Sequence, residues 1–213
     1  MKREESIVPS MEAGEAFAHL VGLQERLLAE GGCPWDREQT LASLRRYVLE
    51  EANEVVSAIN RLLDVEAEIR ATRGLPAADA SPPQPASGEG EDGGDMHAHH
   101  PQREDFSQGN SASGAPLGKG SMPPELARKW ARAKAELCEE IGDLIMQPVF
   151  QAKLAEKLGY FTLVEAIDGI YRKLVRRHPH VFGDARADTP DEVLDSWNAI
   201  KREEKNRDEG GLS

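Results

Sequence analysis

Apolar residues recur every three or four positions along most of the chain, and this spacing limits the fold more than any other feature. The spacing places one apolar stripe on the face of an amphipathic helix. Glycine and proline interrupt it at a few points, where they favour helix ends. We therefore expect an all-α fold, a helical bundle of about four to five helices. The helices are predicted at residues 11–30, 38–71, 124–159 and 162–178 and after Thr189, with loops at 33–36 and 179–188.

Residues 72–124 differ from the rest of the chain, because they are rich in proline, glycine and serine and almost lack large apolar side chains. Such a segment cannot bury enough surface to offset the entropy lost on ordering. We expect a disordered insertion here, and one domain formed together by residues 1–71 and 125–213. The histidine-rich tract at 97–100 lies inside this insertion, without fixed partners for a metal site.

The overall charge limits the partners. The 213 residues carry a formal net charge of −12 and the pI is near 5.0, which argues against nucleic acid as a partner. No apolar run is long enough to span a membrane, and the first ten residues lack the apolar core of a signal peptide. Two distant cysteines do not form a disulfide framework. We expect a cytoplasmic protein without membrane partners.

Glu51 is unusual because it lies on a face that is otherwise apolar. At about 100° per residue, it falls about 20° from Leu44 on the helical wheel. Glu54, three residues later, shares that face, whereas Glu50 points about 100° away. A charge on a core face is unfavourable unless another group compensates it.

The helix predicted at 124–159 repeats the anomaly. Its segment around residues 136–152 is apolar on most sides and is expected to be largely buried. One narrow polar stripe interrupts it, in which Glu140 and Asp143 form a second acidic pair. The stripe consists of Glu136, Glu140, Asp143, Gln147 and Gln151.

Three interpretations of these acids remain open. Most acids on helices simply face water, which suits Glu50 better than Glu51 or Glu140. Ion pairs with Arg45, Arg46 or a basic group of the helix at 162–178 are a second interpretation. The third is a hard divalent cation, since Mg²⁺ binds carboxylate oxygens and bridges substrate phosphates.

Basic residues concentrate at the end of the helix predicted at 162–178. Lys173, Arg176 and Arg177 form a set that suits phosphate, although basic residues also complement the dipole at a helix C-terminus. Trp35 is a candidate for stacking on a base, or a buried aromatic residue that closes a turn. Asp36 could cap the helix at 38–71.

Several of these motifs together resemble a known family. EEANE at 50–54, followed by EIGD at 140–143, is similar to the EExxE…ExxD signature of the all-α nucleotide pyrophosphohydrolase superfamily. The flanking motifs resemble the MazG nucleoside triphosphate pyrophosphohydrolases more specifically. These flanks are CPWDREQT at 33–40, KLVRRHPHVFGD at 173–184 and WNAIKREEK at 197–205.

The resemblance implies a helical bundle, usually a homodimer, that uses Mg²⁺, with Mn²⁺ as an alternative ion. It implies hydrolysis of nucleoside triphosphates to the monophosphate and pyrophosphate, often for nucleotide-pool sanitation. Glu50 would be an outer-shell group or a base for water. The remaining implied sites are Glu51, Glu54, Glu140 and Asp143 for the metal, and Lys173, Arg176, Arg177 and Lys201 for phosphate.

The chain departs from the family pattern at three positions. Leu41 replaces a polar residue, Gln151 replaces a histidine, and Pro148 removes one helical hydrogen bond. These changes concern substrate preference and rate more than the reaction class. Two alternatives remain: a narrower pyrophosphatase acting on dUTP, dCTP or a phosphoribosyl nucleotide, and a non-enzymatic helical interaction module.

Overall fold

The computed structural model describes residues 10–76 and 122–210, and these residues form helices without a strand. The all-α prediction is confirmed. The helices are α1 (Met11–Leu28), α2 (Pro34–Glu38), α3 (Leu41–Thr72), α4 (Pro124–Lys157), α5 (Leu163–Arg177), α6 (Pro179–Phe182) and α7 (Pro190–Gly210). Most of the predicted insertion, with the tract at 97–100, lies outside the described residues.

The two short helices α2 and α6 correct the sequence prediction, which expected loops at these places. Each begins with a proline, Pro34 or Pro179, at its first position. Proline has the φ angle of a helix and lacks only an N–H that would have no partner there. In each of the two expected loops, the proline therefore starts a short helix.

The N-terminus of α3 also differs from the prediction. Asp36 is not its cap but lies inside α2. The cap is Thr40, whose side-chain oxygen accepts from the Ser43 N–H at 3.0 Å, while Ser43 Oγ accepts from the Thr40 N–H at 2.9 Å. This reciprocal pair satisfies two N–H groups of the first turn, and α3 consequently starts at Leu41 and not at Glu38.

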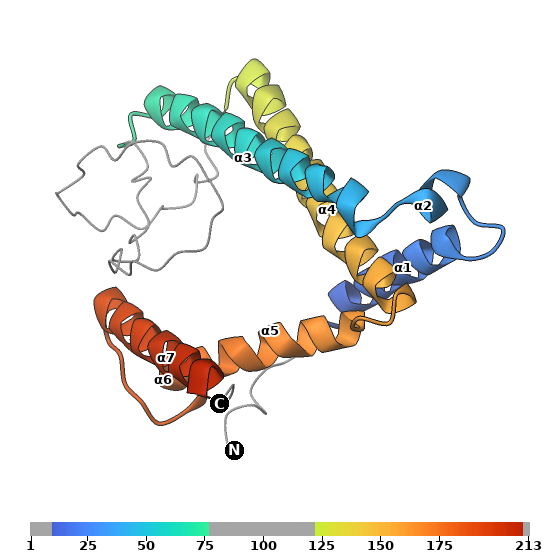
Figure 1. Ribbon diagram of the computed structural model, residues 1–213. Helices are drawn as coiled ribbons and strands as arrows, with labels where there is room; N and C mark the ends of the chain where they lie inside the picture. The colour runs from blue at the N-terminus through green and yellow to red at the C-terminus, as the bar shows by residue number, and fades with distance from the viewer. Residues whose placement is uncertain (1–9, 77–121, 211–213) are drawn as a thin grey trace.

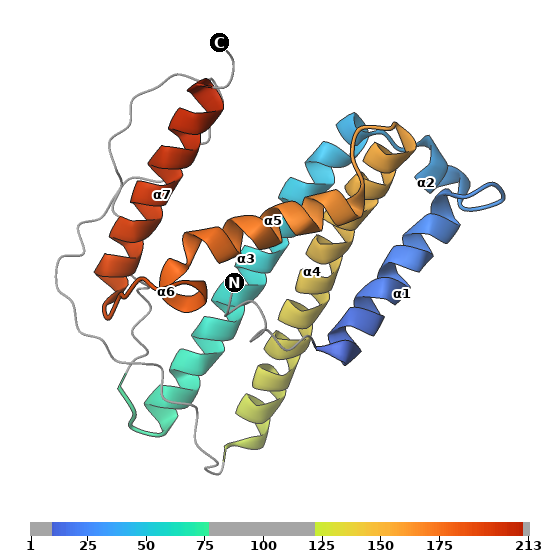
Figure 2. The same ribbon diagram turned by 90° about the horizontal axis from the view of Figure 1, so that it is seen from below.

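α3 and α4 form the centre of the molecule and lie side by side over most of their length (Figures 1 and 2). They run antiparallel: Glu68 near the end of α3 pairs with Lys129 near the start of α4 at 3.1 Å. At the other end, Leu44 packs with Phe150 and Leu154 in the buried core. This register places the middle of α3 beside the middle of α4.

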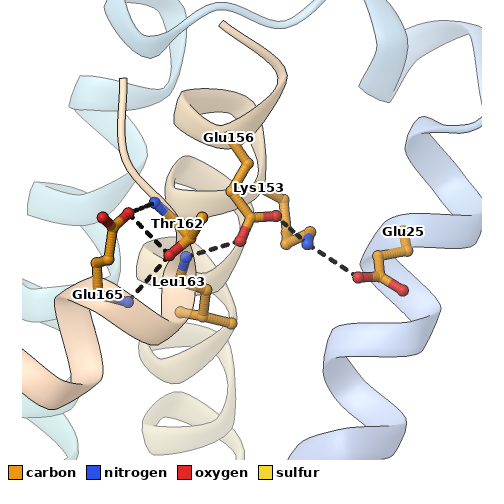
Figure 3. Close-up of polar contacts among 6 residues, drawn as sticks. All are labelled: Glu25, Lys153, Glu156, Thr162, Leu163 and Glu165. Carbon is orange, nitrogen blue, oxygen red and sulfur yellow. Dashed lines mark hydrogen bonds and ion pairs between the residues drawn. The ribbon is translucent and has the colours of Figure 1, made fainter. Parts of the chain in front are cut away.

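A polar cluster connects α1, α4 and the start of α5 (Figure 3). Lys153, whose side chain is 15% exposed, pairs with Glu25 of α1 at 2.9 Å and with Glu156. Glu156 accepts the Leu163 N–H at 2.7 Å. Burial lowers the pKa of Lys153, but its bonds to Glu156 and Glu25 outweigh this, so the pKa is raised. The cluster fixes the corner between α4 and α5.

α5 begins with the predicted capping box. Thr162 accepts from the Glu165 N–H at 3.1 Å, and Glu165 accepts from the Thr162 N–H at 2.7 Å. α6 and α7 lie toward the other end of α5, away from the corner with α4 (Figures 1 and 2).

The expectation that α4 is largely buried around residues 136–152 is wrong for the single chain. Ile141 and Ile145 are 42% and 46% exposed, and Cys138 is exposed too. Only the part from Gln147 onward is mostly buried. α3, α1 and α5 are the helices that pack against α4, and they leave Ile141 and Ile145 uncovered.

Candidate metal centre and phosphate pocket

Three carboxylates converge between α3 and α4. Glu51 and Glu54 come from one turn of α3, and Glu140 comes from α4. Each contributes an oxygen atom, and these oxygens lie within 4.8 Å of one another. The i, i+3 spacing puts the first two on one face, and the antiparallel register places Glu140 opposite them.

Asp143 lies outside this group of three but close to it. Its charge raises the pKa of both Glu51 and Glu140. Glu50 is exposed and is not part of the group. The structure thus brings together the four acids expected to bind metal, which we call the acidic quartet, and leaves Glu50 beside it.

Burial and mutual repulsion perturb the quartet. Partial burial raises the pKa of Glu51, and the charges of Asp143 and Glu54 raise it further. Burial, followed by Glu54, likewise raises the pKa of Glu140. None of the ion pairs formed in the described part of the chain involves a member of the quartet. A hard divalent cation would compensate this charge, because its preferred ligands are carboxylate oxygens.

Another member of the polar stripe does form an ion pair, but with a partner that the sequence analysis did not name. Glu136 pairs with Arg61 of α3 at 2.9 Å. One turn beyond Asp143, Gln147 is 5% exposed, and its Nε2 donates to Glu51 Oε1 at 3.5 Å. The stripe on the helical wheel included Gln147, but sequence reasoning gave it no role.

The basic residues predicted to contact phosphate line one pocket of about 670 Å³. α5 contributes Lys173, Arg176 and Arg177, and α7 contributes Lys201. These residues come together because α7 folds back against the end of α5. The pocket is completed by Glu204, Lys205 and Arg207.

Glu204 is the acidic residue of this pocket and was missed from the sequence. Arg176 Nε donates to its Oε1 at 2.5 Å, and Arg177 Nη2 donates to its Oε2 at 2.6 Å. Hydrogen bonds from Arg177 and then Arg176 lower the pKa of Glu204 to about 2. Trp197 lies against Arg177, with the guanidinium carbon 5.1 Å from the ring centroid. Glu204 lies three residues after Lys201, and this spacing places both on one face of α7. That this face meets the end of α5 is defined only by the fold.

Trp35 lies in a different pocket, of about 450 Å³. Trp35 is 53% exposed, and its ring meets the Tyr47 ring edge-on, with centroids 6.2 Å apart. Gln39, Arg45 and Arg46 also line this pocket. The interpretation of Trp35 as a fully buried aromatic residue is therefore wrong, whereas its role toward a base stays a prediction.

Comparison with known proteins identifies the family. Residues 124–182 match the model of the MazG nucleotide pyrophosphohydrolase domain. The nucleoside triphosphate pyrophosphohydrolase of Escherichia coli K12 is 30% identical over 187 residues, covering 87% of this chain and 44% of that protein. The chain contains a MazG nucleotide pyrophosphohydrolase domain. This confirms the resemblance expected from the acidic motifs and their flanks.

Other relatives align over nearly the whole chain. The nucleoside triphosphate pyrophosphohydrolase/pyrophosphatase MazG of Thermotoga maritima is 29% identical over 196 residues, covering 92% of this chain and 48% of that protein. The uncharacterized protein YabN of Bacillus subtilis is 28% identical and covers 92% of this chain but 26% of its own length. The chain thus spans less than half the length of these relatives.

The MazG domain match includes Glu140, Asp143 and the basic residues of α5, but not Glu51 or Glu54. The alignment with the Thermotoga maritima protein covers 196 of the 213 residues, so its span also includes Glu51 and Glu54 of α3. No solved structure is significantly similar to the chain. Among the described helices, none combines the length and apolar character needed to cross a bilayer.

Proposed function

We propose that the chain is a divalent-metal-dependent nucleoside triphosphate pyrophosphohydrolase that converts NTPs and dNTPs to the monophosphate and pyrophosphate. The convergence of three carboxylates within 4.8 Å, from two helices of a MazG-family chain, carries this proposal. Related proteins that are named nucleoside triphosphate pyrophosphohydrolases support the reaction class. Nucleotide-pool sanitation is the proposed role, and the cytoplasmic location stays a prediction from composition.

The acidic quartet fits Mg²⁺, with Mn²⁺ as the alternative ion. All its donors are carboxylate oxygens, which hard cations prefer, and Glu51 and Glu140 have raised pKa values that a cation would lower. Glu51, Glu54, Glu140 and Asp143 would hold the ion. Such an ion lowers the pKa of bound water and neutralises phosphate charge.

The other residues have roles toward the substrate. Water adds to the α-phosphorus, and the oxygen bridging the α- and β-phosphorus leaves with pyrophosphate. Lys173, Arg177 and Lys201 would stabilise the charge on this leaving group, together with Arg176. We assign Glu50 to an outer-shell position or to deprotonation of the attacking water, and Trp35 to the base.

We further propose that the chain acts as a homodimer. In the single chain, a row of apolar residues along α5 is at least 41% exposed, including Val164, Ile167 and Tyr171. Val56 of α3 and Ile141 of α4 are exposed as well. Large exposed apolar surface on a protein of this size marks an interface, and a second copy would cover it.

A product assay tests the proposed reaction. Purified protein is mixed with each NTP and dNTP in Mg²⁺ or in EDTA, and monophosphate, pyrophosphate and phosphate are separated by chromatography. We expect monophosphate and pyrophosphate, only with the metal. Glu51→Gln and Glu140→Gln should each lower kcat more than about 100-fold, since even removal of a ligand's supporting partner costs 10–100-fold.

Glu139→Gln is the matched control, because it removes a nearby exposed charge on α4 without removing a proposed ligand. Release of phosphate, or wild-type rates in both quartet variants, would show that the proposal is wrong. A rate confined to dUTP, dCTP or a phosphoribosyl nucleotide would favour the narrower enzyme.

A further inference from the structure

Gln147 is a buried polar residue that the packing of the protein does not explain. It lies on α4 between the partly buried Met146 and the core residues Val149 and Phe150, and only 5% of its surface is exposed. Its Oε1 is buried and has no hydrogen-bond partner. A methionine would fill a similar volume without placing an unpaired carbonyl group in the interior, which is unfavourable. The amide therefore costs stability at this position.

The amide has one directed contact, and it leads to the acidic quartet. Nε2 donates to Glu51 Oε1 at 3.5 Å, from one turn beyond Asp143 on α4. This distance is long for an N–H···O bond. The bond nevertheless connects a donor on α4 directly to a carboxylate of the quartet. It is also a bond between α4 and α3, so it relates the two helices that supply the quartet.

We infer that Gln147 is a positioning residue of the proposed enzyme: its buried amide holds the Glu51 carboxylate in the orientation that binds the divalent cation. The inference rests on the proposed function and adds a residue to it. Groups that hold a metal ligand from behind commonly matter nearly as much as the ligand itself. Buried polar groups that lower stability also tend to occur at functional sites.

Gln24 of α1 provides a matched comparison. It is 4% exposed, and its Oε1 is also buried without a partner. No hydrogen bond joins it to the quartet in the described part of the chain, and its neighbour Glu25 pairs with Lys153 instead. Gln24 and Gln147 thus share burial and an unpaired carbonyl, and only Gln147 reaches a proposed metal ligand.

The test compares Gln147→Met with Gln24→Met in the full chain. Melting temperature is measured without metal and then during a Mg²⁺ titration in the presence of a nonhydrolysable dNTP analogue. We expect neither variant to melt below wild type without metal. Gln147→Met should raise the Mg²⁺ concentration for half-maximal stabilisation by about tenfold or more, whereas Gln24→Met should leave it unchanged. Gln147→Leu serves as the second variant if the methionine variant does not fold.

Two results would overturn the inference. One is an unchanged Mg²⁺ requirement in Gln147→Met or Gln147→Leu. The other is a loss of metal-free stability that accounts for the whole effect, which would indicate a structural role. Hydrolysis of dNTPs by the wild type is measured in parallel. If the wild type neither hydrolyses dNTPs nor responds to Mg²⁺, the proposed function fails and the inference fails with it. If the wild type hydrolyses dNTPs and is stabilised by Mg²⁺, an unchanged Mg²⁺ requirement in the variants contradicts only the role of Gln147.

Discussion

Arg177 donates two hydrogen bonds to one oxygen of Glu204, from Nε at 3.1 Å and from Nη2 at 2.6 Å. Arg176 occupies the other oxygen. The contact joins the end of α5 to α7 and builds the basic pocket around a carboxylate of the chain itself. Two of the cations assigned to phosphate are therefore already in contact with an anion.

Glu204→Gln should lower the melting temperature at pH 7, and the difference from wild type should shrink in acid. The pKa of Glu204 is about 2 in the folded protein, below its ordinary 4.5. Its stabilising contribution is therefore fully present above about pH 4.5 and is lost as pH falls toward 2. Melting curves between pH 7 and pH 2 would measure this. The control is Glu203→Gln, which affects only an exposed pair with Arg207 at 3.7 Å. A difference that stays constant over the whole range would contradict the assignment.

Lys201→Met should weaken substrate binding without affecting the fold. Lys201 is exposed and lines the basic pocket. A hydrogen bond to a charged group contributes about 1.5–3 kcal/mol, so KM should rise roughly 10- to 100-fold at an unchanged melting temperature. Steady-state kinetics with a dNTP would show the change. Arg202→Met is the control, since Arg202 is also exposed but does not line the pocket; an equal rise in KM there would indicate a general charge effect.

Glu51→Gln should stabilise the metal-free protein at pH 7 while it abolishes the response to Mg²⁺. The folded-state pKa of Glu51 is raised by burial and by neighbouring acids. A raised pKa means that the group favours the fold at low pH, and that this contribution is lost as pH rises through the raised value. The glutamine of the variant is uncharged and does not repel the neighbouring acids. The variant should therefore be more stable than wild type at pH 7, and this difference in stability should diminish toward pH 4.5.

Melting curves in EDTA and in Mg²⁺ at several pH values test this expectation. Wild type should gain stability from Mg²⁺ with nucleotide, and the variant should not. A metal-free variant that melts below wild type at pH 7 would mean that Glu51 is held by contacts other than those of the quartet.

Lys153→Met should destabilise the protein by about 1.5–3 kcal/mol, because the substitution removes hydrogen bonds to charged groups at a mostly buried position. Urea unfolding would measure the change. Arg172→Met is the exposed counterpart. Its pair with Asp168 at 3.6 Å is open to solvent, so the cost should stay below about 0.5 kcal/mol. Similar costs for both would argue against a special role for the corner between α4 and α5.

Val164→Glu should convert the proposed dimer to a monomer that is still folded. Val164 is 66% exposed in the single chain and lies in the first turn of α5, where an acid is favourable toward the helix dipole. Light scattering would give the mass, and circular dichroism would report the helix content. Arg172→Gln on the same helix is the control. A wild type that is monomeric at every accessible concentration would refute the dimer.

Much of the secondary structure follows from local signals. Thr162 and Glu165 predicted the start of α5, and Thr189 with Pro190 predicted the start of α7. The errors in the predicted secondary structure also concern short segments. The short helix α2 was expected to be a loop, since five residues are too few for a periodic pattern to show. Its presence moved the start of α3 to Leu41.

The candidate site likewise has features that follow from local sequence and features that depend on the fold. The sequence by itself determined that Glu51 and Glu54 share a face, as do Glu140 and Asp143, because an α-helix turns by a constant angle per residue. Only the tertiary structure decided that these two faces meet, and that Gln147 and Glu204 touch their partners. Such contacts depend on the register between helices far apart in the chain, which is set by the packing of whole side-chain surfaces and not by local spacing.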